Sequence, residues 1–303
     1  MPVFNEPDAG RDYDRDMPER RSPTLRRRRL SAELRQLRAS AGMTLEQVAE
    51  RLEFSTAKLR FIENSQWVRP NIGDVRALLD VYGVKDARQH EELLTLAREG
   101  RQRGWWQPYS KMLSETYTTY IGLEAEASTL LTYQPLVIPG LLQTEEYARA
   151  LVQNPHDEVS EQVTSDRVAV RMQRQQILTG PGPLSLWAVI DEAAIRRPVG
   201  GLEVMYGQLE RLAEAARMPS VTLQLIPFSI GAHPGVGRGP FTILQFPDEA
   251  DRDAAYVDNF AGELYIEEAA EVERFHGAFR HLVGAALSPA ATMTFIAEEL
   301  ASR

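Results

Sequence analysis

The chain has 303 residues, of which 43% are hydrophobic and 25% are charged, and it contains no cysteine. This composition is typical of a folded globular protein, and the length is enough for two domains. The absence of cysteine excludes disulfides, a thiolate nucleophile and cysteine-ligated zinc. The sequence also has no apolar run long enough to span a bilayer and no apolar core of a signal peptide, so we expect a cytoplasmic protein without membrane contact.

Positive charge is concentrated near the N-terminus. Between Arg20 and Arg76, thirteen Arg and Lys residues stand against six acidic residues, a local net charge of +7 in a chain whose net charge is -9. A basic segment on an acidic body predicts that the N-terminal part binds a polyanion. The basic residues are nearly all arginine, a bias that a GC-rich coding sequence produces and that fits an actinobacterial source.

The N-terminal part is predicted to be helical. Residues 1–24 are rich in Asp, Arg, Pro and Gly without periodicity, so we expect a disordered arm. Apolar residues at helical spacing then predict four short helices that form an all-α domain over residues 25–84. The second helix begins at Thr44, with a capping box, and the third begins at Ser55. A further helix within residues 85–104 is expected to connect this domain to the rest of the chain.

Residues 105–303 predict a mixed α+β domain. Helical spacing marks segments around residues 121–131, 144–152, 160–178 and 202–217, and two helices at the end. Strand-like segments are rich in β-branched and aromatic residues, and they cover residues 184–190, 221–228, 241–246, 254–257 and 263–266. Gly- and Pro-rich turns between several of them favour an antiparallel sheet. The predicted fold is therefore multidomain, an all-α helix-turn-helix domain followed by an α+β domain with an antiparallel sheet.

Residues 43–64 place two short helices in succession, the arrangement in which the second helix enters the major groove of DNA. A plain helical bundle would show the same periodicity, but the local positive charge and the two caps favour DNA binding. One helix reads few base pairs, so we expect a homodimer on a double-stranded operator, associated with the nucleoid when bound. The expected base-reading residues lie in the first turns of the helix that begins at Ser55: Ser55, Thr56, Ala57, Lys58 and Arg60.

Three motifs cover residues 30–84: Phe-Ser-x-x-Lys-Leu-x-x-Ile-Glu-Asn from residue 54, an Arg-Pro turn at residue 69, and a closing Leu-Leu-Asp-Val-Tyr-Gly-Val. In these the chain resembles the Cro/cI-type helix-turn-helix regulators, the xenobiotic-response-element family. The resemblance implies an ion pair between Arg38 and Glu63. It also implies phosphate contacts at Asn64, at Arg69 and at the start of the helix that Asn71 caps. Thr44 is a further candidate for a phosphate contact.

Two features of the sequence allow more than one interpretation of the DNA contacts. Glu53 stands where this family usually has glycine, and a left-handed glutamate costs about 1 kcal/mol, so a distorted turn is expected. The arginine run at residues 26–29 is either a solvated helix start or a set of phosphate or minor-groove contacts, with Arg28 and Arg29 as the candidates.

Further motifs extend the resemblance beyond residue 84. They are Gly-Trp-Trp from residue 104, Tyr-Ile-Gly-Leu-Glu-Ala-Glu-Ala from 120, Val-Ile-Pro-Gly-Leu-Leu-Gln-Thr from 137, Trp-x-Val-x-Asp-Glu-Ala-Ala from 187, and Pro-Phe-x-x-Gly-Ala-His-Pro-Gly from 227. In these the chain resembles the second domain of the actinobacterial WhiJ-like, antitoxin-like regulators. The resemblance implies a developmental or stress regulator whose C-terminal domain binds a small partner protein encoded nearby.

Residues 229–240 hold four glycines and two prolines around a histidine. A flexible hairpin connection would explain them. A loop that gates a pocket for a small-molecule ligand, or that contacts a protein partner, explains them equally well. Its candidate residues are His233, Gly235 and Arg238.

Catalytic and metal-binding motifs are weak in this sequence. None of the five histidines lies in a metal-ligand motif, and there is no nucleophile elbow, phosphate loop or dinucleotide fingerprint. Asp191 and Glu192 follow a strand but are better explained as an acidic helix start. We therefore expect a protein without metal, cofactor or enzymatic activity. The alternatives are an enzyme in the C-terminal domain localised by the helix-turn-helix, and an interaction protein that has lost DNA binding.

Overall fold

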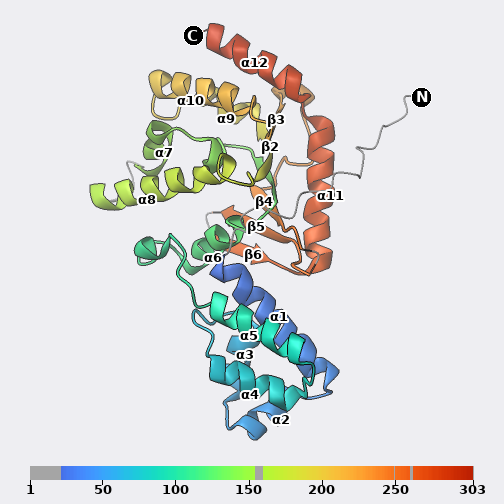
Figure 1. Ribbon diagram of the computed structural model, residues 1–303. Helices are drawn as coiled ribbons and strands as arrows, with labels where there is room; N and C mark the ends of the chain where they lie inside the picture. Colours follow the sequence, from blue (N-terminus) through green and yellow to red (C-terminus); the bar gives the residue numbers. More distant parts are fainter. Residues whose placement is uncertain (1–21, 154–159, 249, 260–261, 303) are drawn as a thin grey trace, which may run out of the picture.

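The computed structural model describes residues 22–153, 160–248, 250–259 and 262–302. Of the expected N-terminal arm, residues 1–21 lie outside the described residues, whereas its last residues begin the first helix. The Ser22 hydroxyl caps that helix, and Pro23 occupies its first turn. The helical domain at the bottom of Figure 1 contains α1 (Pro23–Ser40), α2 (Leu45–Leu52), α3 (Thr56–Glu63), α4 (Ile72–Tyr82) and α5 (Ala87–Glu99).

Side-chain caps set where these helices begin. Thr44 and Gln47 form the complete capping box at the start of α2. The Ser55 hydroxyl accepts a hydrogen bond of 3.1 Å from the Lys58 N–H at the start of α3. Both caps that the sequence predicts are therefore confirmed.

The turn between α2 and α3 contains Glu53 in the left-handed conformation, with φ of 55° and ψ of 34°. The Phe54 N–H donates a 3.0 Å hydrogen bond to the carbonyl of Ala49, so the helix ends as it would with glycine in this turn. The glutamate thus adopts the glycine conformation, and the expectation of a distorted turn is wrong, because the backbone accepts the left-handed glutamate without a change of geometry.

The core of the helical domain collects the apolar faces of all its helices. Helix α5, which the sequence predicts as a connector, is part of this core because Leu93, Leu94 and Ala97 are buried against it. Trp67 joins the core as well, and its indole N–H donates to the hydroxyl of Ser31 at 3.1 Å. The other buried members are Leu30, Leu34, Val48, Ala49, Leu59, Ile62, Val75, Leu78, Leu79 and Tyr82.

Among the described residues, the C-terminal domain is built on a six-stranded sheet in the order β3-β2-β1-β4-β5-β6. Strands β1, β2 and β3 are parallel to one another, whereas β4, β5 and β6 follow in antiparallel pairing. The strands are β1 (Thr129–Gln134), β2 (Ser185–Asp191), β3 (Val221–Ile226), β4 (Phe241–Gln245), β5 (Ala254–Asn259) and β6 (Gly262–Ile266). The expectation of an antiparallel sheet is therefore right for one half only, because helical crossovers and not tight turns join β1 to β2 and β2 to β3.

Strand β1 lies where the sequence predicts the end of a helix. Helix α6 (Glu115–Glu124) stops earlier, and the apolar run after it forms a strand between β2 and β4. Leu130 pairs with Leu186 on one side and with Leu244 on the other. A short apolar run of this kind cannot be assigned to helix or strand by periodicity alone, which explains the error.

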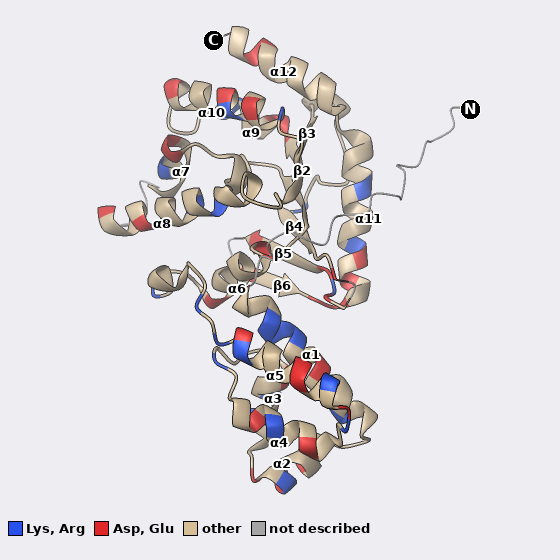
Figure 2. Cartoon of the chain, in the orientation of Figure 1, with Lys and Arg blue, Asp and Glu red and all other residues tan. Residues whose placement is uncertain are grey.

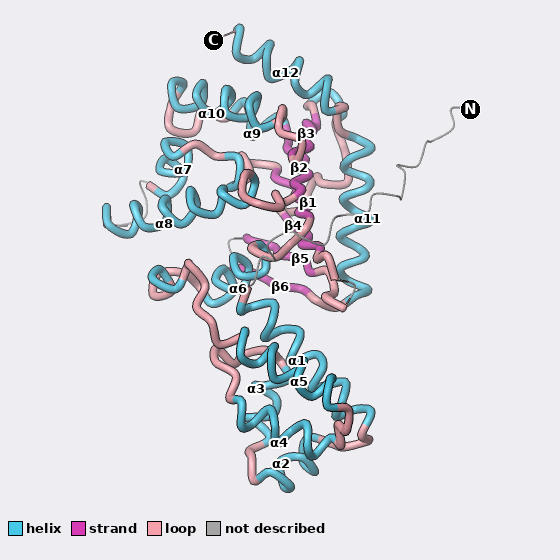
Figure 3. The backbone as a smooth tube through the Cα atoms, in the orientation of Figure 1, coloured by secondary structure: helices cyan, strands magenta, loops and turns pink. Residues whose placement is uncertain are grey.

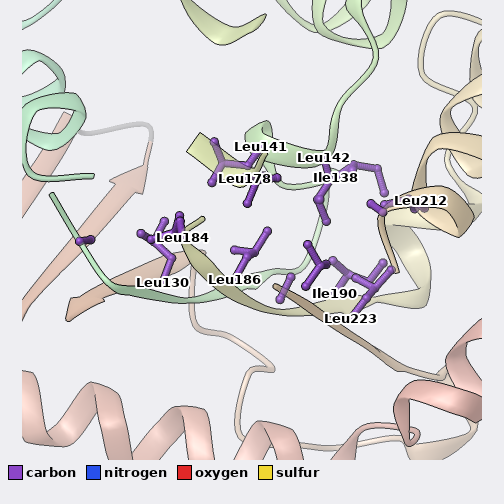
Figure 4. Packing of buried hydrophobic residues seen from close by; sticks show 14 of the residues in the cluster. Leu130, Ile138, Leu141, Leu142, Leu178, Leu184, Leu186, Ile190, Leu212 and Leu223 are labelled. Carbon is purple, nitrogen blue, oxygen red and sulfur yellow. The ribbon is translucent and has the colours of Figure 1, made fainter. Parts of the chain in front are cut away.

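Helices cover both faces of the sheet, as Figures 1 and 3 show. Helix α11 (Ala269–Ala285) packs on one face, while α7 (Glu145–Val152), α8 (Glu161–Arg174) and α10 (Leu202–Ala215) lie over the other. Figure 4 shows the core of that second face, where Leu130 and Leu186 point toward Ile138 and Leu141. The remaining elements are α9 (Glu192–Arg196), α12 (Pro289–Ala301) and short 3-10 turns at Gln107–Tyr109, Gly140–Leu142, Gln175–Leu178 and Phe228–Ile230.

The architecture confirms the predicted fold class, a helical helix-turn-helix region followed by a mixed α+β region. Within the described ranges no helix has the length and apolar character needed to cross a membrane.

Candidate nucleic-acid interface

Helix α3 buries one side and exposes the other. Leu59 and Ile62 are buried in the domain core, whereas Ser55, Ala57 and Arg60 are exposed. Thr56 and Lys58 lie half-buried between these two sides. A helix held from behind, with short polar side chains and an arginine in front, has the width and the chemistry to enter a major groove.

The two basic side chains of α3, Lys58 and Arg60, differ in their contacts with other residues. The Lys58 ammonium lies 2.8 Å from a carboxylate oxygen of Asp74 and 3.5 Å from the ring centroid of Phe54. No ion pair between described residues involves Arg60, which is exposed one turn further along the helix. Of the expected base-reading residues, Arg60 therefore has its full guanidinium available, whereas Lys58 would have to leave Asp74.

The expected phosphate-binding residues lie at helix ends. Thr44 and Asn71 begin α2 and α4, Asn64 ends α3, and Arg69 lies in the turn between α3 and α4. All of them are exposed. Because backbone N–H groups at a helix start attract anions, this arrangement offers several phosphate contacts around α3.

Arg38 of α1 and Glu63 of α3 form the ion pair that the resemblance implies. The Arg38 Nε and Nη2 atoms donate to the two carboxylate oxygens of Glu63 at 2.6 and 2.9 Å, and Nη1 donates to the carbonyl of Met43 at 2.8 Å. Glu63 is only 5% exposed. The hydrogen bond to Glu63 raises the pKa of Arg38, and this fork-to-fork pair fixes α3 against α1.

Arg28 and Arg29 contact the C-terminal domain. The Arg28 Nε lies 2.5 Å from a carboxylate oxygen of Glu267, and Arg29 pairs with Asp248 and, at 3.7 Å, with Asp251. In Figure 2 the basic stretch of α1 lies at the end of the helix that meets the sheet. Phosphate contacts by these arginines would have to compete with the ion pairs. The sequence did not indicate these partners, which follow more than 200 residues later.

Two family models match the chain. Residues 29–93 match a helix-turn-helix domain, and residues 117–298 match a domain of unknown function, DUF5753. The chain belongs to the DUF5753 family. Its N-terminal domain is a helix-turn-helix domain, and the match includes most of α5, in agreement with the shared core. No curated protein and no solved structure matches the chain.

In the loop at residues 229–240 of the DUF5753 domain, some residues pack against the sheet and others are exposed. His233 lies with its Nε2 3.5 Å from an Asp191 carboxylate oxygen, and its Nδ1 accepts from the Gly235 N–H at 3.2 Å. A Cβ atom on Gly235 would lie 2.5 Å from the Cζ of Tyr133, so the loop packs closely on the sheet. Arg238 is exposed. Of the three candidate residues, only Arg238 is thus presented to a partner.

Asp191 and Glu192 have structural partners. The Asp191 carboxylate caps α9 by accepting from the Ala193 N–H at 2.9 Å. Glu192 pairs with Arg196 at 2.6 Å and accepts from the N–H of Phe228 at 2.7 Å. In the described parts of the chain, no group of three or more His, Asp or Glu side chains could hold a metal ion.

A buried ion pair in the DUF5753 domain was not predicted from the sequence. Arg174 of α8 donates from Nε and Nη2 to both carboxylate oxygens of Glu124 at 2.7 and 2.6 Å, and from Nη1 to the Tyr117 hydroxyl at 2.5 Å. The Tyr120 hydroxyl donates to Glu124 at 2.9 Å. The pair is 50 residues apart in the chain, and only the fold brings it together. It joins α6 to α8.

Proposed function

We propose that the protein is a sequence-specific transcriptional regulator that binds a double-stranded DNA operator through α2, α3 and α4. The observation that carries the proposal is the state of α3: its apolar side and the Arg38–Glu63 pair hold it in place, and its other side exposes Ser55, Ala57 and Arg60. Such a helix is positioned before it meets DNA, so little ordering is needed on binding.

Within this proposal the residues have separate roles. Arg60 reads a base, for which guanine offers the best pair of acceptors to a guanidinium. Arg69 and the helix starts at Thr44 and Asn71 hold phosphates on either side. Arg28 and Arg29 belong to the contact between the domains, because carboxylates of the DUF5753 domain already neutralise them.

We further propose that the protein acts as a homodimer on a palindromic operator and that the DUF5753 domain has the regulatory role, in an antitoxin-like regulator of development or stress. Two helix-turn-helix domains would reach half-sites about 34 Å apart, or a multiple of that distance. The exposed apolar side chains Phe228, Ile230 and Val236, next to Arg238, support a protein partner at that loop. The proposal includes no catalysis, since Asp191 and Glu192 are engaged in helix capping and ion pairing.

The experiment is a binding titration of the full chain by fluorescence anisotropy, on DNA from upstream of its own gene and on scrambled DNA of equal length. Arg60→Ala should remove about 1–3 kcal/mol of discrimination between the two DNAs. Arg69→Ala should weaken binding to both alike and lower the salt slope by about one. Arg88→Ala, an exposed arginine on α5, is the matched control and should change neither. Absence of binding to either DNA at low salt would rule the proposal out.

A further inference from the structure

A cavity with a volume of about 230 Å³ lies in the DUF5753 domain, on the face of the sheet opposite α11. Its floor includes Leu130, Thr132 and Gln134, alternate residues of β1 that share one face of the sheet. The strand order reverses at β1, because β2 and β3 follow on one side of it and β4 on the other, and the cavity extends to the carboxyl end of β1. Open α/β sheets bind ligands at such a switch point.

The cavity walls are largely aromatic and aliphatic. Tyr117 and Tyr120 of α6 stack with ring centroids 6.1 Å apart, and Tyr120 lies 4.4 Å from the ring of Tyr256 on β5. Leu130 and Leu186 close the other side, in the region drawn in Figure 4. These walls fit a flat apolar group.

The cavity has two arginines, and one of them is already neutralised. Arg174 is buried and forms the two-pronged pair with Glu124. It therefore has no charge to offer a ligand. The pair joins α6 to α8 at the wall of the cavity.

Arg171, one helical turn before Arg174, has no such partner. Its Nη1 donates to the neutral Gln143 Oε1 at 3.0 Å, and it also hydrogen-bonds with Tyr117, but no ion pair between described residues involves it. Burial lowers the pKa of Arg171, because the negative charge of Asp258 compensates the cost of burying the guanidinium only in part. The lining of the cavity includes one carboxylate, that of Asp258. This residue is exposed, so water screens its charge. A guanidinium at the wall of a partly apolar cavity is stabilised by an anion brought to it.

We propose that this cavity is a binding site for a small aromatic monocarboxylate, whose carboxylate pairs with Arg171 and whose ring lies among Tyr117, Tyr120 and Tyr256. The volume is below the roughly 300–1,000 Å³ typical of pockets for drug-sized ligands, so the ligand is small. A phosphate dianion fits less well than a monoanion, because the one guanidinium without an ion-pair partner carries a single positive charge and Asp258 repels the doubly charged ligand more strongly. The regulatory significance of this site rests on the proposed function, but binding of the carboxylate ligand does not require DNA.

The test is isothermal titration of the full-length protein, without DNA, with benzoate and with benzamide, its neutral counterpart of the same shape. Benzoate should bind saturably and at least about tenfold more tightly than benzamide, because the charge-assisted hydrogen bond to Arg171 is lost with the amide. Arg171→Gln should lower benzoate affinity by about tenfold or more. Arg167→Gln makes the same change on the exposed side of α8 and should leave the affinity unchanged.

The outcomes separate this inference from DNA binding. Absence of saturable benzoate binding, equal affinity for benzamide, or unchanged affinity in folded Arg171→Gln would each overturn the site. The benzoate and benzamide comparison uses the unmodified protein, so it decides the matter even where Arg171→Gln fails to fold. None of these results bears on the operator titration, and loss of operator binding would leave the ligand site standing.

Discussion

A Cβ atom placed on Gly122 of α6 would lie 2.6 Å from the Cβ of Thr24, in the first turn of α1. At this point the helix that begins the DNA-binding domain packs directly on the helix that lines the cavity. The Ser22 N–H donates to Glu126, Arg26 lies 3.3 Å from the same carboxylate, and Leu25 is buried in the C-terminal core. Helix α1 thus contributes side chains to the cores of both domains.

Gly122→Ala should therefore destabilise the protein. Alanine favours a helix by up to about 1 kcal/mol over glycine, but here its methyl group would overlap Thr24, at a cost of about 1–3 kcal/mol. Urea unfolding measures the difference. Gly207→Ala, within α10, is the matched control: no atom lies within 4 Å of its added Cβ, so this variant should be more stable. Equal gains at both positions would contradict the close packing of α1 on α6.

Glu53→Gly should stabilise the protein by up to about 1 kcal/mol, because glycine adopts the left-handed conformation without the penalty that glutamate carries. Thermal unfolding of the two proteins provides the measurement. Glu50→Gly, three residues earlier inside α2, should instead lose about 1 kcal/mol. A loss of stability in both variants would mean that the Glu53 side chain makes a contact of its own.

Glu63→Ala should destabilise the helix-turn-helix domain by about 3 kcal/mol, since it leaves the Arg38 guanidinium at a partly buried site without its carboxylate. Helix α3 loses its tie to α1, so affinity for DNA should fall with stability. Chemical unfolding and the anisotropy titration measure the two effects. The control is Glu92→Ala, which breaks an exposed pair with Arg88 and should cost no more than about 0.5 kcal/mol. A similar small effect at both sites would argue against a structural role for Glu63.

Acid should weaken the inter-domain contact through Asp248. The Ala250 N–H and the Arg29 guanidinium lower the pKa of this carboxyl in the folded protein. Its contribution to stability is then present above the unfolded value of about 3.9 and is lost as the pH falls through the folded value. Arg29→Ala should reduce this loss, measured as the difference in unfolding free energy between about pH 7 and pH 3. An unchanged pH dependence would show that Arg29 does not act on Asp248.

The same variant decides the role of Arg29 toward DNA. If the contact between domains is its function, Arg29→Ala should leave operator affinity near that of the unmodified protein, in contrast to Arg69→Ala. Losses of equal size and equal salt dependence would instead assign Arg29 to a phosphate.

The sequence by itself determined the helix-turn-helix. The caps at Thr44 and Ser55 and the apolar spacing of the helices depend on residues a few positions apart, so their chemistry can be read along the chain. Most strands of the second domain could be predicted from the sequence for the same reason.

Only the tertiary structure decided how these parts work together. Strand β1 became a strand because β2 and β4 flank it, although its apolar run suits a helix as well. The partners of Arg28 and Arg29, the Glu124–Arg174 pair and the cavity beside Arg171 join segments far apart in sequence. Such contacts depend on which surfaces the fold brings together. Local sequence makes Arg28 and Arg29 candidates for DNA contacts, but in the folded chain they form ion pairs between the two domains.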